Sequence, residues 1–172
     1  MEDLPADCWS HPDVEVRPSL IAGRGLFATA PLPAGTEVAR LGGRPVGTAE
    51  LRDLMGGEGY VDSVVLGADR HLVLPTGSTV HFANHGCDPT LGWTSRCSLV
   101  ALSDLPAGTE LTSDYATSTA DRDWLLHCHC PSRRCRQMIE GTDWQIPQLQ
   151  QRYAGHWLPY LQTLIDPQRQ TG

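Results

Sequence analysis

The residues best suited to chemistry are cysteines that crowd into one short stretch. The chain has six cysteines in 172 residues, and Cys128, Cys130 and Cys135 fall within eight positions of "LLHCHCPSRRCRQM". Thiolates at this C-x-C-x4-C spacing can approach one tetrahedral zinc ion, but a structural zinc site usually has four protein ligands. The cluster therefore predicts a zinc site that needs one more ligand from elsewhere in the chain.

The fourth ligand is a cysteine from another segment or a histidine. His127 and His129 alternate with two of the cysteines, so using them as ligands would strain the loop. Cys8 and Cys97 are further candidates. Cys87 lies in "HFANHGCDPTLGW", a stretch of polar turn-forming residues that something must hold in place. A site that includes Cys87 would join the two segments with a free energy on the order of 10 kcal/mol. Unligated thiols are the alternative, and disulfides fit less well.

Composition limits the compartment and the partners. The N-terminus is acidic and has no apolar signal-peptide region, and no run reaches membrane-spanning length. Both features predict a reducing, cytoplasmic location without a membrane, where clustered cysteines more often bind metal than form disulfides. The net charge of −7 argues against binding to nucleic acid through its phosphates. It suits a protein that receives a basic partner, or one with an acidic solvated surface.

Short strands must position these residues. Apolar or alternating runs interrupted by Gly and Pro are typical of a β-rich domain. The sequence "LPAGTE" occurs at 32–37 and again at 105–110. Its Pro and Gly favour a tight connection between antiparallel strands, so two similar β-turn-β units are expected. The predicted strands cover 25–29, 37–41, 71–74, 79–82 and 98–103.

Helices are predicted at two places. Residues 48–59 favour one short helix that stops at a Gly pair. From residue 146 onward, apolar residues recur at helical spacing, but Gly155 and Pro159 prevent one continuous helix. We therefore expect helices at about 147–154 and 159–166, which would pack an apolar face on the body as a cap.

Four motifs together resemble one family. They stand in the order and spacing of a SET-domain protein lysine methyltransferase with a post-SET zinc loop. This resemblance implies a mainly β fold, a β-clip with a pseudoknot, followed by the zinc-bound loop and short C-terminal helices. It implies an N-terminal extension (1–13), a SET domain (14–117), a post-SET loop (118–140) and a helical cap (141–172). The motifs are "AGRGLFAT" (22–29), "FANHGCDP" (82–89), "GTELTSDY" (108–115) and "CHCPSRRC" (128–135).

The resemblance also implies roles for individual residues. Tyr115 would be catalytic, between the methyl group of S-adenosylmethionine and the nitrogen of a lysine on a protein substrate. The lysine channel would include Ser113, Phe82 and Tyr60. The zinc ligands would be Cys87, Cys128, Cys130 and Cys135. The residues expected to bind S-adenosylmethionine are Gly23, Arg24, Gly25, Leu26, Asn84, His85 and Trp144.

The chemistry requires a neutral lysine. A free lysine has a pKa of about 10.4, so only about 0.1% of it is neutral at pH 7.4. A tight apolar channel next to a cationic sulfonium lowers that pKa, and alignment supplies much of the remaining rate.

The chain departs from the family pattern around the channel. Ser113 stands where the family usually has Phe or Tyr, which leaves the number of transferred methyl groups open. Leu41 or Arg40 stands where many members have a channel tyrosine, and Tyr60 could replace it. Two alternatives follow from these departures. One is a weak or inactive SET-like module that binds protein, and the other is a methyltransferase for a small amine or a non-lysine side chain.

Overall fold

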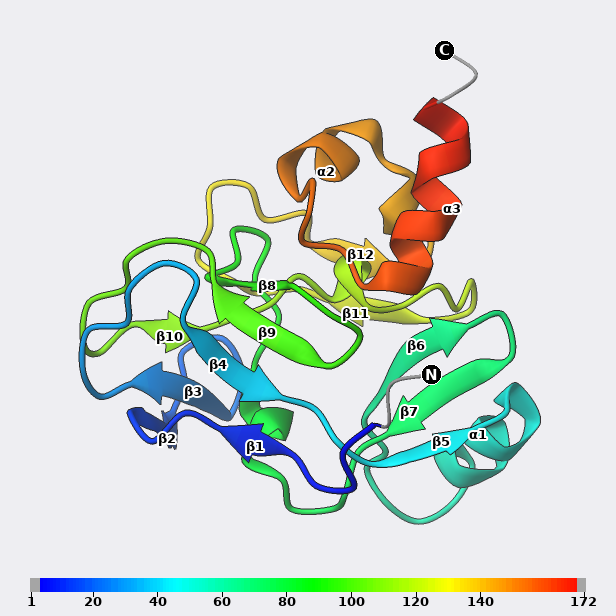
Figure 1. The fold of residues 1–172 in the computed structure, drawn as a ribbon, viewed down its shortest axis with the longest axis horizontal. Helices are drawn as coiled ribbons and strands as arrows, with labels where there is room; N and C mark the ends of the chain where they lie inside the picture. The colour runs from blue at the N-terminus through cyan, green and yellow to red at the C-terminus, as the bar shows by residue number, and fades with distance from the viewer. Residues whose placement is uncertain (1–3, 170–172) are drawn as a thin grey trace.

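A computed structural model describes residues 4–169 of the chain (Figure 1). Most of the regular structure is short antiparallel strands, which confirms the predicted mainly β fold. The first sheet has the strand order β1-β4-β9-β8 and the second has the order β10-β3-β2. The first sheet contains β1 (Trp9–Ser10), β4 (Glu37–Arg40), β9 (Ser98–Ala101) and β8 (Leu91–Trp93). The second contains β10 (Glu110–Leu111), β3 (Arg24–Ala28) and β2 (Val14–Pro18).

The two "LPAGTE" copies connect these two sheets. The first copy runs from β3 to β4 and the second from β9 to β10, so each joins strands of different sheets. The prediction of two similar units is confirmed, but each copy is a crossover and not a hairpin turn. Leu32 and Leu105 of the two copies exchange backbone hydrogen bonds of 2.9 and 2.8 Å. Gly35 and Gly108 have φ values of 81° and 84°, which favour glycine at the same place in both copies.

A third sheet and a helix form an insert between β4 and β8. Helix α1 (Thr48–Met55) stops at Gly56, as predicted, and packs near the strands β5-β7-β6. The predicted strand at 79–82 is wrong, because Thr79–Phe82 forms a 3-10 helix. The backbone amides of this segment donate to carbonyls three residues earlier, for example Ala83 N–H to Val80 O at 3.1 Å. A short apolar run is compatible with a helix as well as with a strand. The strands of the insert are β5 (Arg44–Val46), β6 (Ser63–Gly67) and β7 (Arg70–Val73).

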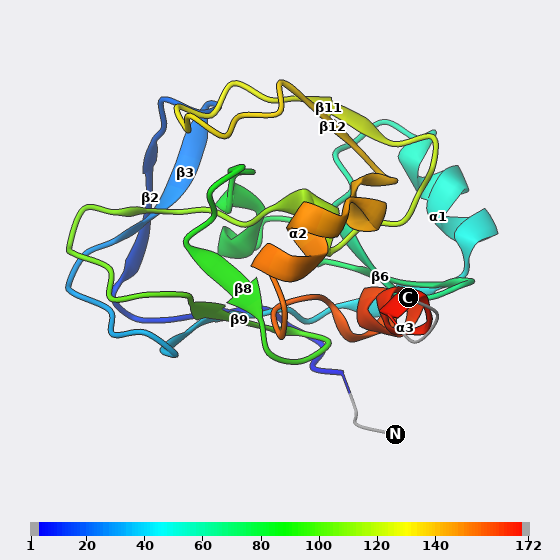
Figure 2. The same ribbon diagram turned by 90° about the horizontal axis from the view of Figure 1, so that it is seen from above.

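The remaining chain forms the cysteine loop and the C-terminal cap. Strands β11 (Leu125–His127) and β12 (Met138–Glu140) pair antiparallel and flank the cysteine cluster. Figure 2 shows this loop crossing the molecule between β3 and α1. The two predicted cap helices are confirmed as α2 (Pro147–Arg152) and α3 (Pro159–Arg169). Gly155, with a φ of 83°, lies between them. No helix within residues 4–169 has the length and apolar character needed to cross a membrane.

Candidate active site and metal centre

Tyr115 is fixed at the point where several segments meet. It begins a 3-10 helix (Tyr115–Thr117), and the preceding Asp114 caps this helix by accepting from Ala116 N–H at 3.1 Å. The Tyr115 N–H donates to His85 Nδ1 at 3.2 Å, and its hydroxyl donates to Ala83 O at 2.9 Å. Burial raises the pKa of the Tyr115 phenol, and the nearby Asp62 and Tyr60 add to the effect. The phenol is therefore protonated and able to donate a hydrogen bond at neutral pH.

His85 connects Tyr115 to the cysteines. Burial lowers the pKa of His85 to about 4; Asp114 opposes this shift and Arg136 adds to it, so the ring is neutral at pH 7. Since Nδ1 accepts from Tyr115, the one ring proton belongs on Nε2. That atom lies 3.3 Å from Cys87 Sγ. The hydrogen-bond pattern thus assigns His85 as a donor to the Cys87 sulfur.

The predicted zinc ligands come together. The Sγ atoms of Cys87, Cys128, Cys130 and Cys135 all lie within 4.8 Å of one another. The Cys87 and Cys128 sulfurs are 3.9 Å apart, close to the ~3.8 Å expected for two ligands of tetrahedral zinc with Zn–S bonds of about 2.3 Å. The other candidates lie outside this cluster: Cys8 bonds Gly42 and Cys97 contacts Ser95, while His127 and His129 are exposed.

Backbone donors point at these sulfurs. Arg136 N–H lies 3.3 Å from Cys87 Sγ, and Cys130 N–H lies 3.4 Å from Cys128 Sγ. Burial raises the pKa of the Cys87 thiol to about 11 and raises that of Cys128 as well. A cation is therefore needed to hold both as thiolates at neutral pH. The donor type, the spacing and the amide donors fit a zinc ion better than a disulfide.

A buried ion pair, which the sequence analysis did not predict, supports the same region. Arg136 donates from Nη1 and Nη2 to the two oxygens of Asp114, both at 2.7 Å, and from Nε to Asp143 at 3.0 Å. Tyr153, directly after α2, donates its hydroxyl to Asp114 Oδ2 at 2.9 Å. The one sequence signal is the position of Arg136 directly after the last clustered cysteine.

The residues expected to hold the methionine part of the cofactor also come together. The Asn84 side-chain amide lies within hydrogen-bonding distance of Arg24 O (3.0 Å) and Glu110 Oε1 (2.9 Å). A Cβ at Gly25 would meet the end of the Glu110 side chain, so a larger residue there would displace the carboxylate that lies beside the Asn84 amide. Gly23 has a φ of 44°. This strand start and the Asn84 amide form a polar corner beside Tyr115's helix.

Three other predicted residues lie elsewhere. Leu26 is fully buried in the main core, and Trp144 packs against the core of the cap. The Phe82 ring lies 4.6 Å below the Arg24 guanidinium, on the side of the polar corner. By contrast Trp124, which no motif predicted, has its ring centroid 6.2 Å from that of Tyr115.

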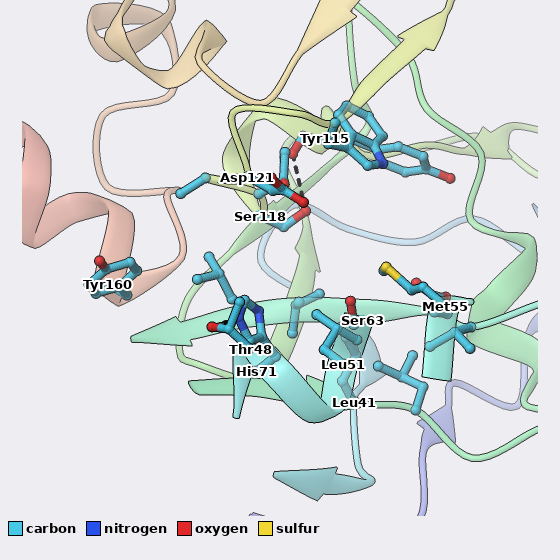
Figure 3. A pocket seen from close by; sticks show the side chains of 18 of the residues that line it. Leu41, Thr48, Leu51, Met55, Ser63, His71, Tyr115, Ser118, Asp121 and Tyr160 are labelled. Atoms are coloured by element: carbon cyan, nitrogen blue, oxygen red, sulfur yellow. Dashed lines mark hydrogen bonds between the residues drawn. The ribbon is translucent and has the colours of Figure 1, made fainter. Parts of the chain in front are cut away.

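A cavity of about 630 Å³ has Tyr115 in its wall (Figure 3). Its walls are the insert and the chain that follows Tyr115. Ser113 and Tyr60, which were expected in the lysine channel, line it, and so does Leu41, one of the two residues that could stand in the place of the family's channel tyrosine. In Figure 3, Tyr115 lies on the wall opposite Leu51, Ser63 and Met55 of the insert. The lining that the sequence analysis missed includes Asp62, His71, Asp121, Trp124 and Tyr160.

Comparison with known proteins gives one family. Residues 23–116 match the model described as "SET domain". The chain is 31% identical over 143 residues to human histone-lysine N-methyltransferase 2B, covering 73% of this chain and 5% of that protein. It is 32% identical over 137 residues to trithorax, a histone-lysine N-methyltransferase of Drosophila melanogaster, covering 70% of this chain and 4% of that protein. The chain thus spans only a small part of these relatives.

A solved structure has the same fold. The methyltransferase domain of human histone-lysine N-methyltransferase SETMAR aligns with a TM-score of 0.58 and 22% sequence identity, covering 72% of this chain and 56% of that chain. At this identity the alignment establishes the shared fold only.

Proposed function

Because the chain belongs to the SET-domain family, we propose that it transfers a methyl group from S-adenosylmethionine to the side-chain amine of a protein lysine. The observation that carries this proposal is the setting of Tyr115. Its backbone is held by His85, the residue that follows Asn84 of the polar corner, its phenol is protonated, and it lines the cavity. A phenol held in this way can orient two reacting groups on either side of it.

The cavity suits the target lysine. Leu41, Leu51 and Val64 supply apolar walls, and Trp124 supplies an aromatic ring next to Tyr115. Such walls exclude water from an amine, which lowers its pKa and favours the neutral, nucleophilic form. Asp62 and Asp121 also line the cavity and favour a cationic substrate on entry. The substrate is therefore a lysine-bearing protein segment, for which nucleic acid and membrane contacts are not required.

The polar corner suits the cofactor. When bound, S-adenosylmethionine supplies the methyl group as an electrophile on its sulfonium. The main chain of Gly23, Arg24 and Gly25 would bind the amino-acid part, with the Asn84 amide as a hydrogen-bonding group beside it. Trp144 and His85 remain proposed contacts.

The cysteine cluster would hold a structural zinc ion with four thiolate ligands. Its position beside His85 and Arg136 supports a role in holding the site in shape and not in the reaction itself. Four clustered cysteines that do not form disulfides also support a reducing location such as the cytosol.

The test is a methyl-transfer assay with zinc-loaded protein, labelled S-adenosylmethionine, a pool of basic proteins and lysine-rich peptides. The chain contains no lysine, so lysine label cannot come from self-modification. We expect label on substrate lysine, loss of that label in Tyr115→Phe, and cofactor binding by calorimetry that is nearly unchanged in this variant. Asn84→Ala should instead weaken cofactor binding. Cofactor binding without turnover on any substrate would favour a SET-like binding module.

A further inference from the structure

Arg136 lies where the cysteine centre and the Tyr115 helix meet. Its backbone N–H donates to Cys87 Sγ at 3.3 Å, and its guanidinium forms two parallel bonds of 2.7 Å with Asp114, the residue before Tyr115. We propose that Arg136 is a positioning residue through which the cysteine centre fixes Tyr115. The inference rests on the proposed function only for the role of Tyr115.

Asp114 is bonded on every side. It is 0% exposed, and its Oδ1 accepts from Arg136 Nη2 and from Ala116 N–H at 3.1 Å. Its Oδ2 accepts from Arg136 Nη1 and from the Tyr153 hydroxyl at 2.9 Å. Because Asp114 holds the amide on the other side of Tyr115, the orientation of its carboxylate sets where the 3-10 helix begins. A bidentate guanidinium fixes that orientation, whereas a single point charge does not.

The loop around Arg136 is itself tightly held. Cys135, its neighbour, belongs to the cysteine cluster. Gln137 has a φ of 62°, in the left-handed region that non-glycine residues seldom adopt. Its carbonyl accepts from Cys128 N–H at 2.7 Å. The backbone on both sides of Arg136 is therefore tied to the cysteines, and a change at the cluster must move the guanidinium.

The ion pairs of Arg136 with two acids contribute to stability as well as to position. Arg136 is the cation shared by Asp114 and Asp143, at 2.7 and 3.0 Å. Burial lowers the pKa of Arg136, but these two carboxylates raise it overall, so it stays charged. Removing Arg136 alone would leave two buried acids without their shared partner, which is strongly destabilising. A single variant would therefore mix loss of stability with loss of position.

The experiment separates the two effects with a double variant. Arg136→Met leaves Asp114 and Asp143 uncompensated, whereas Arg136→Met with Asp114→Asn removes both charges of the bidentate pair, keeps the Tyr153 and Ala116 partners, and leaves only Asp143 without its cation. Arg136→Lys keeps the charge without the two parallel bonds. The control is Arg134→Met in the same loop, since Arg134 pairs with Asp88 at 3.0 Å on the surface, with side chains 59% and 60% exposed. For each protein we would measure thermal unfolding, zinc release to a chelator, amide exchange of residues 113–118, and kcat and KM.

We expect Arg136→Met to lose stability, and the double variant to regain the part of that loss that comes from uncompensated Asp114, while Asp143 still lacks its cation. The double variant should still exchange the 113–118 amides faster than the wild type. Its kcat should be about 10- to 100-fold lower, because a small misplacement of a catalytic group costs that much in rate. Its KM for the cofactor should change less than about threefold. This variant should also release zinc faster than Arg134→Met, which should behave as the wild type. Arg136→Lys should give values of kcat, amide exchange and zinc release between those of the double variant and those of the wild type.

A double variant with normal kcat and normal exchange at 113–118 would overturn the proposal and reduce Arg136 to a neutralising charge. If the wild type itself showed no methyl transfer, the proposed function would fail. The exchange and zinc-release measurements would still decide whether Arg136 connects the cluster to Tyr115.

Discussion

The two sides of Tyr115 are built on different principles. On the inner side, His85, Cys87, Asp114 and Arg136 are joined by hydrogen bonds and are buried or partly buried. On the outer side lies the cavity, where Tyr60 is 76% exposed and Met55 is also exposed. The inner side fixes positions through bonded polar groups, and the outer side leaves room for a ligand.

This difference explains what each side can tolerate. A buried polar network fails when any member loses its partner, because the abandoned group pays the full cost of desolvation. A cavity wall mainly provides shape, so a substitution there changes what fits more than whether the protein folds. Substitutions of the same kind on the two sides should therefore have unequal effects.

The largest effect is expected from breaking the cysteine cluster. Cys128→Ser should abolish high-affinity zinc binding and expose the loop 124–140 to amide exchange, since such sites contribute on the order of 10 kcal/mol. Zinc content and hydrogen exchange measure this. Cys97→Ser is the matched control, because Cys97 lies outside the cluster beside Ser95. Equal zinc loss in both variants would mean that the clustered cysteines do not form the site.

Removing one tyrosine hydroxyl from each side gives a direct comparison of their stability. Tyr153→Phe removes a donor to the buried Asp114 and should lower the free energy of unfolding by about 1–3 kcal/mol. Tyr60→Phe removes an exposed hydroxyl on the cavity side, and should change stability by less than about 0.5 kcal/mol. Denaturant titration of both variants gives the comparison. Equal losses would show that the cavity wall is as tightly bonded as the inner side.

The sequence singled out the cysteines of the inner side more readily than most of the cavity lining of the outer side. A thiolate metal site restricts both the residue type, which must be cysteine, and the spacing of the ligands. Cys87 and the loop cysteines can therefore be recognised from the sequence alone. The two cap helices and α1 were also predictable, because Gly and Pro mark their ends. The cavity residues Trp124 and Tyr160 carry no such constraint, since any large side chain brought there by the fold could form the wall. The guanidinium–carboxylate pair depends on two segments meeting in space, which spacing alone does not reveal.

The next prediction concerns a substitution that fills part of the cavity near Tyr115. Ser113 lines the cavity and is 7% exposed, so Ser113→Phe should fill part of it and reduce the number of methyl groups added to one lysine. Ser113 is buried, and enlarging a buried side chain typically costs about 1–3 kcal/mol, so we expect a stability loss in that range. Mass spectrometry of the product measures the distribution, and Ser113→Ala serves as the control of unchanged size. An unaltered distribution in Ser113→Phe would place the limit on methylation elsewhere in the cavity.

The smallest effect tests whether charge also matters on the outer side. His81 lies 2.9 Å from both Asp62 Oδ2 and Pro75 O and packs against the Tyr60 ring. Its hydrogen bond with Asp62, followed by that with Pro75 and the Asp62 charge, raises the pKa of His81 despite burial. The stability it contributes is therefore complete below the unfolded-state pKa of about 6.5 and is lost as pH rises through the folded value. The advantage of the wild type over His81→Gln in unfolding free energy should shrink between pH 5.5 and 8.5.

His71, which lines the cavity, gives the opposite sign. It bonds Thr48 Oγ1 at 3.1 Å, and burial lowers its pKa while Asp69 and Asp121 oppose the shift. The stability that depends on neutral His71 is present above the unfolded-state pKa and is lost as pH falls through the folded value. The advantage of the wild type over His71→Gln should therefore grow over the same pH range. Parallel slopes for the two variants would mean that the imidazoles do not titrate as their partners require, and the outer wall would then act through shape alone.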